Sequence, residues 1–114
     1  MYGNLYSTSI QLPVDSLVAG DTTLDFSTSN YKIKTLNKSD TLNIVNAPVG
    51  KSVTVVVHND STWTLTWTSA IPIKWQNGTA PIQTTGSYLT TVTDIYIFLR
   101  IGYYIYGTQA ANYY

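Results

Sequence analysis

Residues 61–107, STWTLTWTSAIPIKWQNGTAPIQTTGSYLTTVTDIYIFLRIGYYIYG, decide the predicted fold. Threonine alternates with tryptophan or leucine in residues 62–68, whereas isoleucine and leucine alternate with Tyr96, Phe98 and Arg100 in residues 94–101. Side chains of a strand point to opposite faces with a period of two. Residues 62–68 are therefore predicted to form a half-buried strand. Residues 94–101 are apolar on both faces, which predicts a strand covered by the core on one side and by a partner on the other.

The rest of the chain contains short runs of β-branched and aromatic residues at intervals of about ten residues, separated by turn-forming segments. No window shows an apolar repeat of 3.6 residues. The predicted strands are residues 22–26, 31–37, 41–46, 52–58, 62–68, 73–75, 92–101 and 103–107. Spacing of this kind is typical of a sandwich or barrel. The predicted fold is all-β, an antiparallel β-sandwich of jelly-roll-like form.

The N-terminal segment, residues 1–20, is set apart from the predicted sandwich domain, residues 21–114. Residues 5–12 are extended in character and are followed by Pro13, which cannot continue a hydrogen-bonded ladder. They form either the first strand of the domain or an arm that docks on a neighbour. Residues 14–20 are predicted to be a loop or a single helical turn. A length of 114 residues corresponds to one domain.

The charge of the chain is low and balanced. Six basic residues face six acidic residues, and only 11% of the chain is charged. Nucleic-acid binding needs a basic excess, so nucleic acid is not an expected partner. No stretch reaches eighteen apolar residues, so membrane insertion is not expected. Because charged residues normally guard sheet edges, their scarcity predicts that other subunits cover the edges and apolar patches.

The side chains that support catalysis or metal binding are scarce. The chain has no cysteine and no glutamate, and His58 is its only histidine. A hydrolytic triad would need His58 held by an aspartate and facing a hydroxyl, and no spacing indicates this. No run of alternating aspartates predicts a calcium site. The expected protein is therefore not an enzyme and has no cofactor, metal or catalytic residue.

Tyrosine is the most prominent feature, with ten in the chain. Its ring is flat and apolar, and its hydroxyl is polar, so it suits protein interfaces and sugar faces alike. Trp75, between two prolines, is predicted either to close the end of the core or to stack on a sugar; the candidate glycan contacts are Trp75 and Tyr103. The candidate subunit-interface residues are Tyr96, Phe98, Tyr104, Tyr106, Tyr113 and Tyr114.

The order of several motifs resembles a β-rich module that recurs in virion proteins of tailed phages. The motifs are Trp-Thr-Leu-Thr-Trp, Ile-Lys-Trp with Asn-Gly-Thr-Ala-Pro, Thr-Asp-Ile-Tyr-Ile-Phe-Leu and Gly-Tyr-Tyr-Ile-Tyr-Gly, with Asn-Ile-Val-Asn-Ala-Pro upstream. The resemblance covers residues 22–107. This module is often found at the far end of tail fibres and related appendages, and its motifs are structural rather than catalytic.

The resemblance implies a structural component of a phage virion, located on the capsid surface or the tail. It is expected to be a small capsid decoration or head-fibre protein, or a tail-associated accessory protein. The expected partners are further copies of the chain in a homo-oligomer, a trimer by analogy with phage fibres, together with other virion proteins and a host surface glycan. The module usually ends a longer fibre chain, whereas here it is nearly the whole sequence, which favours a separate accessory subunit. The alternative is a soluble carbohydrate-binding module or lectin.

Overall fold

The structure, a computed structural model, describes residues 14–17 and 20–114. These residues form nine strands and one short 3₁₀ turn, η1 (Gln76–Gly78), without an α-helix in this part of the chain. The prediction of an all-β fold is confirmed. The strands are β1 (Val14–Leu17), β2 (Thr23–Asp25), β3 (Tyr31–Thr35), β4 (Asp40–Val45), β5 (Ser52–Asn59), β6 (Leu65–Ser69), β7 (Ile73–Trp75), β8 (Val92–Ile101) and β9 (Tyr104–Tyr113).

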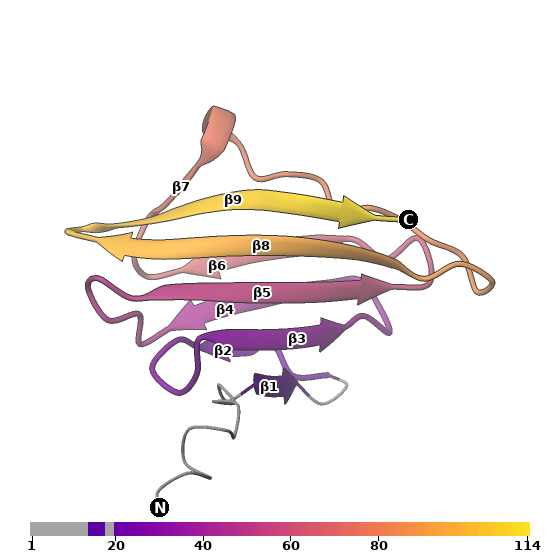
Figure 1. Cartoon of the computed structure of the whole chain (residues 1–114), viewed down its shortest axis with the longest axis horizontal. Coiled ribbons are helices and arrows are strands. Elements are labelled where there is room, and N and C mark those ends of the chain that lie inside the picture. The colour runs from indigo at the N-terminus through magenta and orange to yellow at the C-terminus, as the bar shows by residue number, and fades with distance from the viewer. Residues whose placement is uncertain (1–13, 18–19) are drawn as a thin grey trace, which may run out of the picture.

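The strands form two layers (Figure 1). The larger sheet has six strands in the order β1-β3-β5-β8-β9-β7, and the smaller has three in the order β2-β4-β6. The smaller sheet lies behind the larger one in Figure 1, and buried residues of both sheets meet in a single core. The molecule is therefore a sandwich in which one face of the larger sheet packs on the smaller sheet.

The first six strands alternate between the two sheets. β1, β3 and β5 are neighbours in the larger sheet, β2, β4 and β6 in the smaller, and every one of these neighbouring pairs is parallel. Parallel strands need a crossover connection, and here the strand in the opposite sheet supplies it. The described chain up to β6 thus winds through three turns, as in a short β-solenoid.

The last three strands all join the larger sheet. β8 pairs antiparallel with β5 on one side and with β9 on the other, and β7 lies parallel to β9. Ile101 pairs with Tyr104, which leaves Gly102 and Tyr103 as a two-residue turn, and Gly102 has a φ of 57°. Glycine is favoured at such a position because it has no Cβ to clash. From β8 onward the chain therefore forms an antiparallel hairpin, unlike the parallel strands that precede it.

The antiparallel jelly-roll form predicted from the sequence is therefore wrong, because one sheet is wholly parallel and the other is mixed. The turn segments up to β6 carry the chain from one sheet to the other, so neighbouring strands in each sheet run parallel. Residues 14–17 form a strand paired with β3, which corrects the predicted loop or helical turn. The prediction for residues 5–12 lies outside the described residues.

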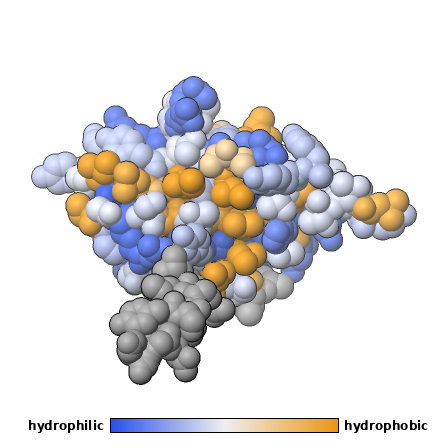
Figure 2. Space-filling view, viewed as in Figure 1, coloured by the Kyte–Doolittle hydropathy of each residue, from blue (hydrophilic) through white to orange (hydrophobic). Residues whose placement is uncertain are grey.

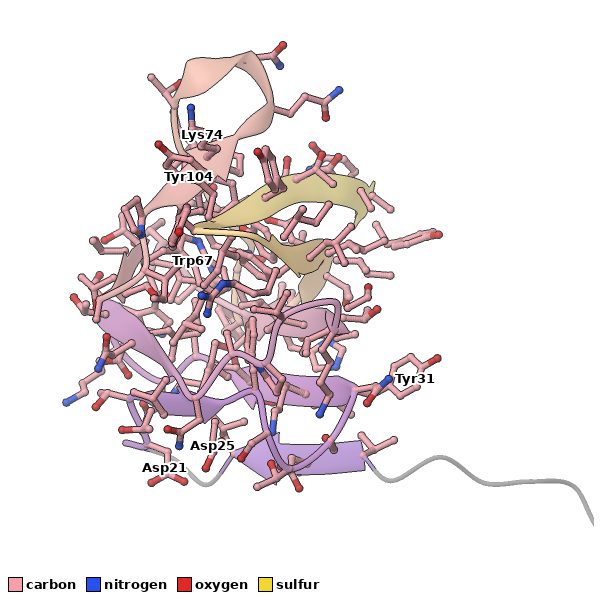
Figure 3. The ribbon with its side chains drawn as sticks, turned by 90° about the vertical axis from the view of Figure 1, so that its left-hand side faces the viewer. Asp21, Asp25, Tyr31, Trp67, Lys74 and Tyr104 are labelled. Atoms are coloured by element: carbon pink, nitrogen blue, oxygen red, sulfur yellow. The ribbon has the colours of Figure 1, made fainter. Side chains whose placement is uncertain are left out.

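The C-terminal end of the core is aromatic. Trp67 of the smaller sheet lies at its centre, with ring centroids 4.9 Å from Tyr96, 5.0 Å from Phe98 and 6.0 Å from Trp75 (Figure 3). Phe26 adds a further contact to Phe98, at 5.6 Å. Such tilted aromatic pairs stabilise a core beyond the area that they bury. Trp67 of the smaller sheet and Trp75 of the larger sheet therefore join the two layers.

The N-terminal end of the same core is polar. Lys32 and Lys34 of β3 point inward and are 1% and 0% exposed. The Lys32 ammonium lies 2.6 Å from Asp15 Oδ2, and its hydrogen bond lowers the pKa of Asp15, with a further contribution from Thr28. The Lys34 ammonium donates to the main-chain oxygen of Asp21 at 2.6 Å. It also lies 3.3 Å from Asp40 Oδ2, an ion-pair distance, although that oxygen accepts no hydrogen bond.

Candidate interaction surface

The outward face of the six-stranded sheet is the surface that carries most of the exposed apolar side chains of the strands (Figure 2). In β8, residues 92, 94, 96 and 98 point into the core, so Ile95, Ile97, Leu99 and Ile101 point outward. Ile97 is 38% exposed and Ile101 is 52% exposed. Nothing in the described chain packs over this face. It is called the outer face below.

The strand register aligns apolar side chains across the outer face. Ile33 of β3 pairs with Val56 of β5, Val56 pairs with Ile95 of β8, and Ile95 pairs with Ala111 of β9. Cross-strand neighbours on one face lie close enough for their side chains to touch. The result is a continuous apolar row over four strands, including the parallel pair β3 and β5. Sheets with parallel strands are usually covered on both faces, so an uncovered row of this kind indicates a docking surface.

One corner of the outer face combines aromatic rings with a lysine. Leu99 pairs with Tyr106, and Tyr106 pairs with Lys74 of β7. The Lys74 ammonium lies 4.4 Å from the centre of the Tyr104 ring (Figure 3), and the Tyr104 and Tyr106 rings are 6.3 Å apart. Lys74, Leu99 and Tyr106 border a shallow groove of about 600 Å³ that Ile97 and Thr108 also line. This corner offers rings, aliphatic groups and one positive charge to a partner.

Carboxylates are missing from the outward positions of β3, β5, β8 and β9. The aspartate of β8, Asp94, points inward and is fully buried. His58 lies near the end of β5, where it pairs with Thr93 of β8, and its Nδ1 atom lies 2.8 Å from Thr93 Oγ1. Among the described residues, no group of three His, Cys, Asp or Glu side chains is placed to hold a metal ion. The outer face is therefore suited to apolar and aromatic contact.

Two of the predicted interface residues lie elsewhere. Tyr96 and Phe98 are both 0% exposed and pack against Trp67 in the core, so they are not available to a second subunit in the folded chain. The alternation in β8 is the predicted one. The assignment of its two faces was inverted, because the smaller sheet presents aromatic side chains that favour aromatic partners. Ile95 and Ile97 point outward, where Tyr96 and Phe98 were predicted to contact a second subunit.

The remaining predicted interface residues are exposed. Tyr104 and Tyr106 project from the outer face of β9 and are 37% and 44% exposed. Tyr113 pairs with Thr93 at the opposite end of the same strand and is 60% exposed, and Tyr114 at the C-terminus is 85% exposed. The tyrosines of β9 therefore border the outer face at both of its ends.

The two candidate glycan contacts are not brought together. Trp75 is half-buried, with its ring 5.5 Å from Phe98 and in contact with Gly107. This packing matches the predicted role of closing the end of the core. Tyr103 lies in the β8–β9 turn and is 85% exposed. Trp75 pairs with Gly107, which is four residues beyond Tyr103, a separation of roughly 13 Å along the strand.

Sequence reasoning missed Lys74, Ile33 and Val56 as residues of this surface. Their patterns place them on strands, but only the order of strands shows that they share a face with Tyr106 or Ile95. Parallel pairing of β3 with β5 could not be read from turn signals. The one feature of the sequence that indicated an outer contact surface was the apolar pattern on both faces of residues 94–101.

Comparison of the chain with protein-family models, with curated proteins and with solved structures found no match. The resemblance to a tailed-phage module therefore stays a prediction. Among the described residues, no helix is long and apolar enough to cross a membrane.

Proposed function

We propose that this chain is a non-enzymatic structural subunit that assembles through the outer face of its six-stranded sheet. The observation that supports the proposal is the uncovered apolar row from Ile33 to Ala111. With about 3.3 Å per residue and 4.8 Å between strands, the six strands cover roughly 600 Å² in projection. This approaches the ~800 Å² that each partner contributes to a standard protein interface.

We propose a further copy of the same chain as the partner. The outer positions of β3, β5, β8 and β9 have no carboxylate to offer a basic partner. Their apolar side chains can pack against the outer faces of other copies around a common symmetry axis. Closed symmetry follows when such a face is buried within a homo-oligomer. Three-fold symmetry rests on the resemblance to phage proteins, as does the assignment to a virion, on the capsid surface or on the tail. The same resemblance supports three further proposals: the role of an accessory subunit, contact with other virion proteins and binding to a host glycan.

The test of the virion assignment is the protein composition of purified phage particles from a strain that encodes this chain. We expect the chain to remain with the particles after density-gradient purification, at a copy number that is a multiple of three. A cryo-EM map should then place it on the capsid surface or on the tail. Its absence from intact particles, with the free protein recovered from the lysate, would overturn the assignment.

A carbohydrate-binding module is the second candidate, and the exposed ring of Tyr103 is the observation that favours it. Binding to a glycan array that is lost in Tyr103→Ser and kept in Tyr88→Ser would support this candidate. Trp75→Ala is a poor probe, because Trp75 packs on Phe98 and its loss would disturb the core.

A further inference from the structure

The loop between β7 and β8 ends in a rigid apolar tip. Ser87 and Thr90 exchange two backbone hydrogen bonds of 2.9 Å, which leaves Tyr88 and Leu89 as the two turn residues. Their side chains are 87% and 79% exposed. The whole stretch from residue 76 to residue 93 carries no charge. Two large apolar side chains are thus presented at the end of a neutral projection, which we call the tip (residues 87–90; Figure 1, at the right).

The base of the tip is held in place by buried polar groups. The Gly86 amide donates to the Ser61 oxygen at 2.8 Å, and a Cβ at Gly86 would lie 2.4 Å from the Asn59 oxygen. The Thr84 amide donates to Asp94 Oδ2 at 2.7 Å, and Asn59 Nδ2 donates to the Thr84 oxygen at 3.0 Å. Asn59 and Asp94 are both 0% exposed. A loop fixed in this way loses little conformational entropy on binding, which favours recognition by its tip.

A groove of about 470 Å³ lies at the opposite end of the sandwich. The tip ends two residues before Val92, the first residue of β8, whereas Arg100 near the last residue of β8 lines the groove. The ten residues of β8 separate the two features by roughly 30 Å. Two hydrogen bonds, to the oxygens of Ala47 at 2.8 Å and Gly102 at 2.9 Å, fix the Arg100 side chain. The apolar part of the groove is lined by Ile44, Val45, Ala47, Pro48, Ala70 and Ile71.

We propose that the tip of one copy inserts into the groove of the next copy, head to tail. The Leu89 side chain meets the aliphatic wall formed by Ala70 and Ile71. The Tyr88 ring meets the Arg100 guanidinium, a contact that arginine makes well with aromatic faces. Because the tip carries no charge, its insertion brings no second charge into the groove, and the Arg100 guanidinium that it covers keeps its hydrogen bonds to the Ala47 and Gly102 oxygens. The chain thus carries both halves of one contact.

The position of the two features determines the type of assembly. They lie at opposite ends of the molecule, so the contact is heterologous and produces a ring or an open row of copies. Two inserted side chains bury a few hundred Å² at most, so this contact is weaker than one through the outer face. It is expected to link copies that are already concentrated, such as subunits on the surface of a particle. The proposal goes beyond the outer-face contact and uses different residues.

Disulfide trapping tests the proposal directly, because the chain has no cysteine of its own. Leu89→Cys and Ala70→Cys are prepared separately, mixed at high concentration and oxidised. Both positions are exposed, so the fold should be retained, and circular dichroism checks this. We expect a disulfide-linked heterodimer in at least about tenfold greater yield than in the control mixture of Leu89→Cys with Thr41→Cys, where Thr41 is exposed on the smaller sheet.

Equal yields in the two mixtures would overturn the proposal. Adding Ile97→Asp to both cysteine variants separates the two interfaces. If only the outer-face proposal fails, cross-linking stays strong and Ile97→Asp has no effect on mass. If only the tip proposal fails, the preference for Ala70→Cys is lost while Ile97→Asp still lowers the oligomer mass.

Discussion

The core of the sandwich has two chemically different ends. Near the N-terminus, β3 directs Lys32 and Lys34 inward, whereas near the C-terminus β8 directs Tyr96 and Phe98 inward. Both strands lie in the same sheet and alternate in the same way. The difference lies in the partners that meet these side chains. At one end they are Asp15 of the neighbouring strand β1, the main-chain oxygen of Asp21 and Asp40 of the opposite sheet, and at the other end Trp67 of the opposite sheet. Whether a lysine or an aromatic ring is buried therefore depends on its partners as much as on its own polarity.

Breaking the polar end should have the largest effect on stability. Lys34→Met removes a fully buried ammonium and leaves the Asp40 carboxylate, 6% exposed, without a positive partner. We expect the free energy of unfolding to fall by about 3–5 kcal/mol, the usual cost of removing one partner of a buried ion pair. Urea denaturation at neutral pH measures this.

The double variant Lys34→Met with Asp40→Leu is the matched control. Replacing both charges with apolar side chains of similar size is often neutral, so more than half of the lost stability should return. A double variant as unstable as Lys34→Met would show that the buried charge is not the cause. The aromatic end lacks such a pair, and no comparable rescue is expected there.

Tyr96 allows a smaller test at the aromatic end, through pH. Burial raises the pKa of Tyr96, and the nearby Asp94 raises it further. A group with a raised folded pKa contributes stability that is complete below its unfolded pKa, about 10, and is lost as the pH rises beyond it. The Tyr96 hydroxyl also donates to Gln83 Oε1 at 2.7 Å, so Tyr96→Phe should cost about 1–2 kcal/mol at pH 7.

Above pH 10 the difference between the native protein and Tyr96→Phe should shrink by about 1.4 kcal/mol per pH unit, because only the native protein loses this contribution. The other tyrosines are common to both proteins, and their effects cancel. Denaturant titrations at pH 7, 10 and 11 provide the comparison. A constant difference across this range would contradict the assigned environment of Tyr96.

The strand content of the fold could be predicted from the sequence, because the local alternation of apolar and polar residues indicates where strands lie. The predicted bounds of β7 and β8 are the observed ones, and those of β2 to β6 differ by three residues or fewer. The last strand was predicted to end at residue 107, whereas β9 continues to Tyr113. Parallel winding could not be predicted, because a turn such as residues 27–30 has the same composition whether it joins strands within a sheet or between sheets. The buried lysines were missed for the same reason, since their acidic partners become neighbours only through that winding.

The candidate surface was only partly predictable. The sequence indicated that both faces of residues 94–101 would be covered, and that tyrosines of the C-terminal strand would be exposed. Which face of β8 points inward depends on Trp67 of β6 and on Phe26, the residue that follows β2. The sequence predicts aromatic contact residues, whereas the aliphatic side chains of β8 form the centre of the outer face.

The mass of the native protein in solution tests the central claim that the outer face joins copies of this chain. Light scattering at micromolar concentration should give about three times the chain mass of 12.6 kDa. Ile97→Asp and Tyr106→Asp should lower the mass toward 12.6 kDa with unchanged circular dichroism, whereas Thr41→Asp on the smaller sheet should leave it unchanged. A native mass near 12.6 kDa, or an oligomer that Ile97→Asp does not affect, would contradict the account.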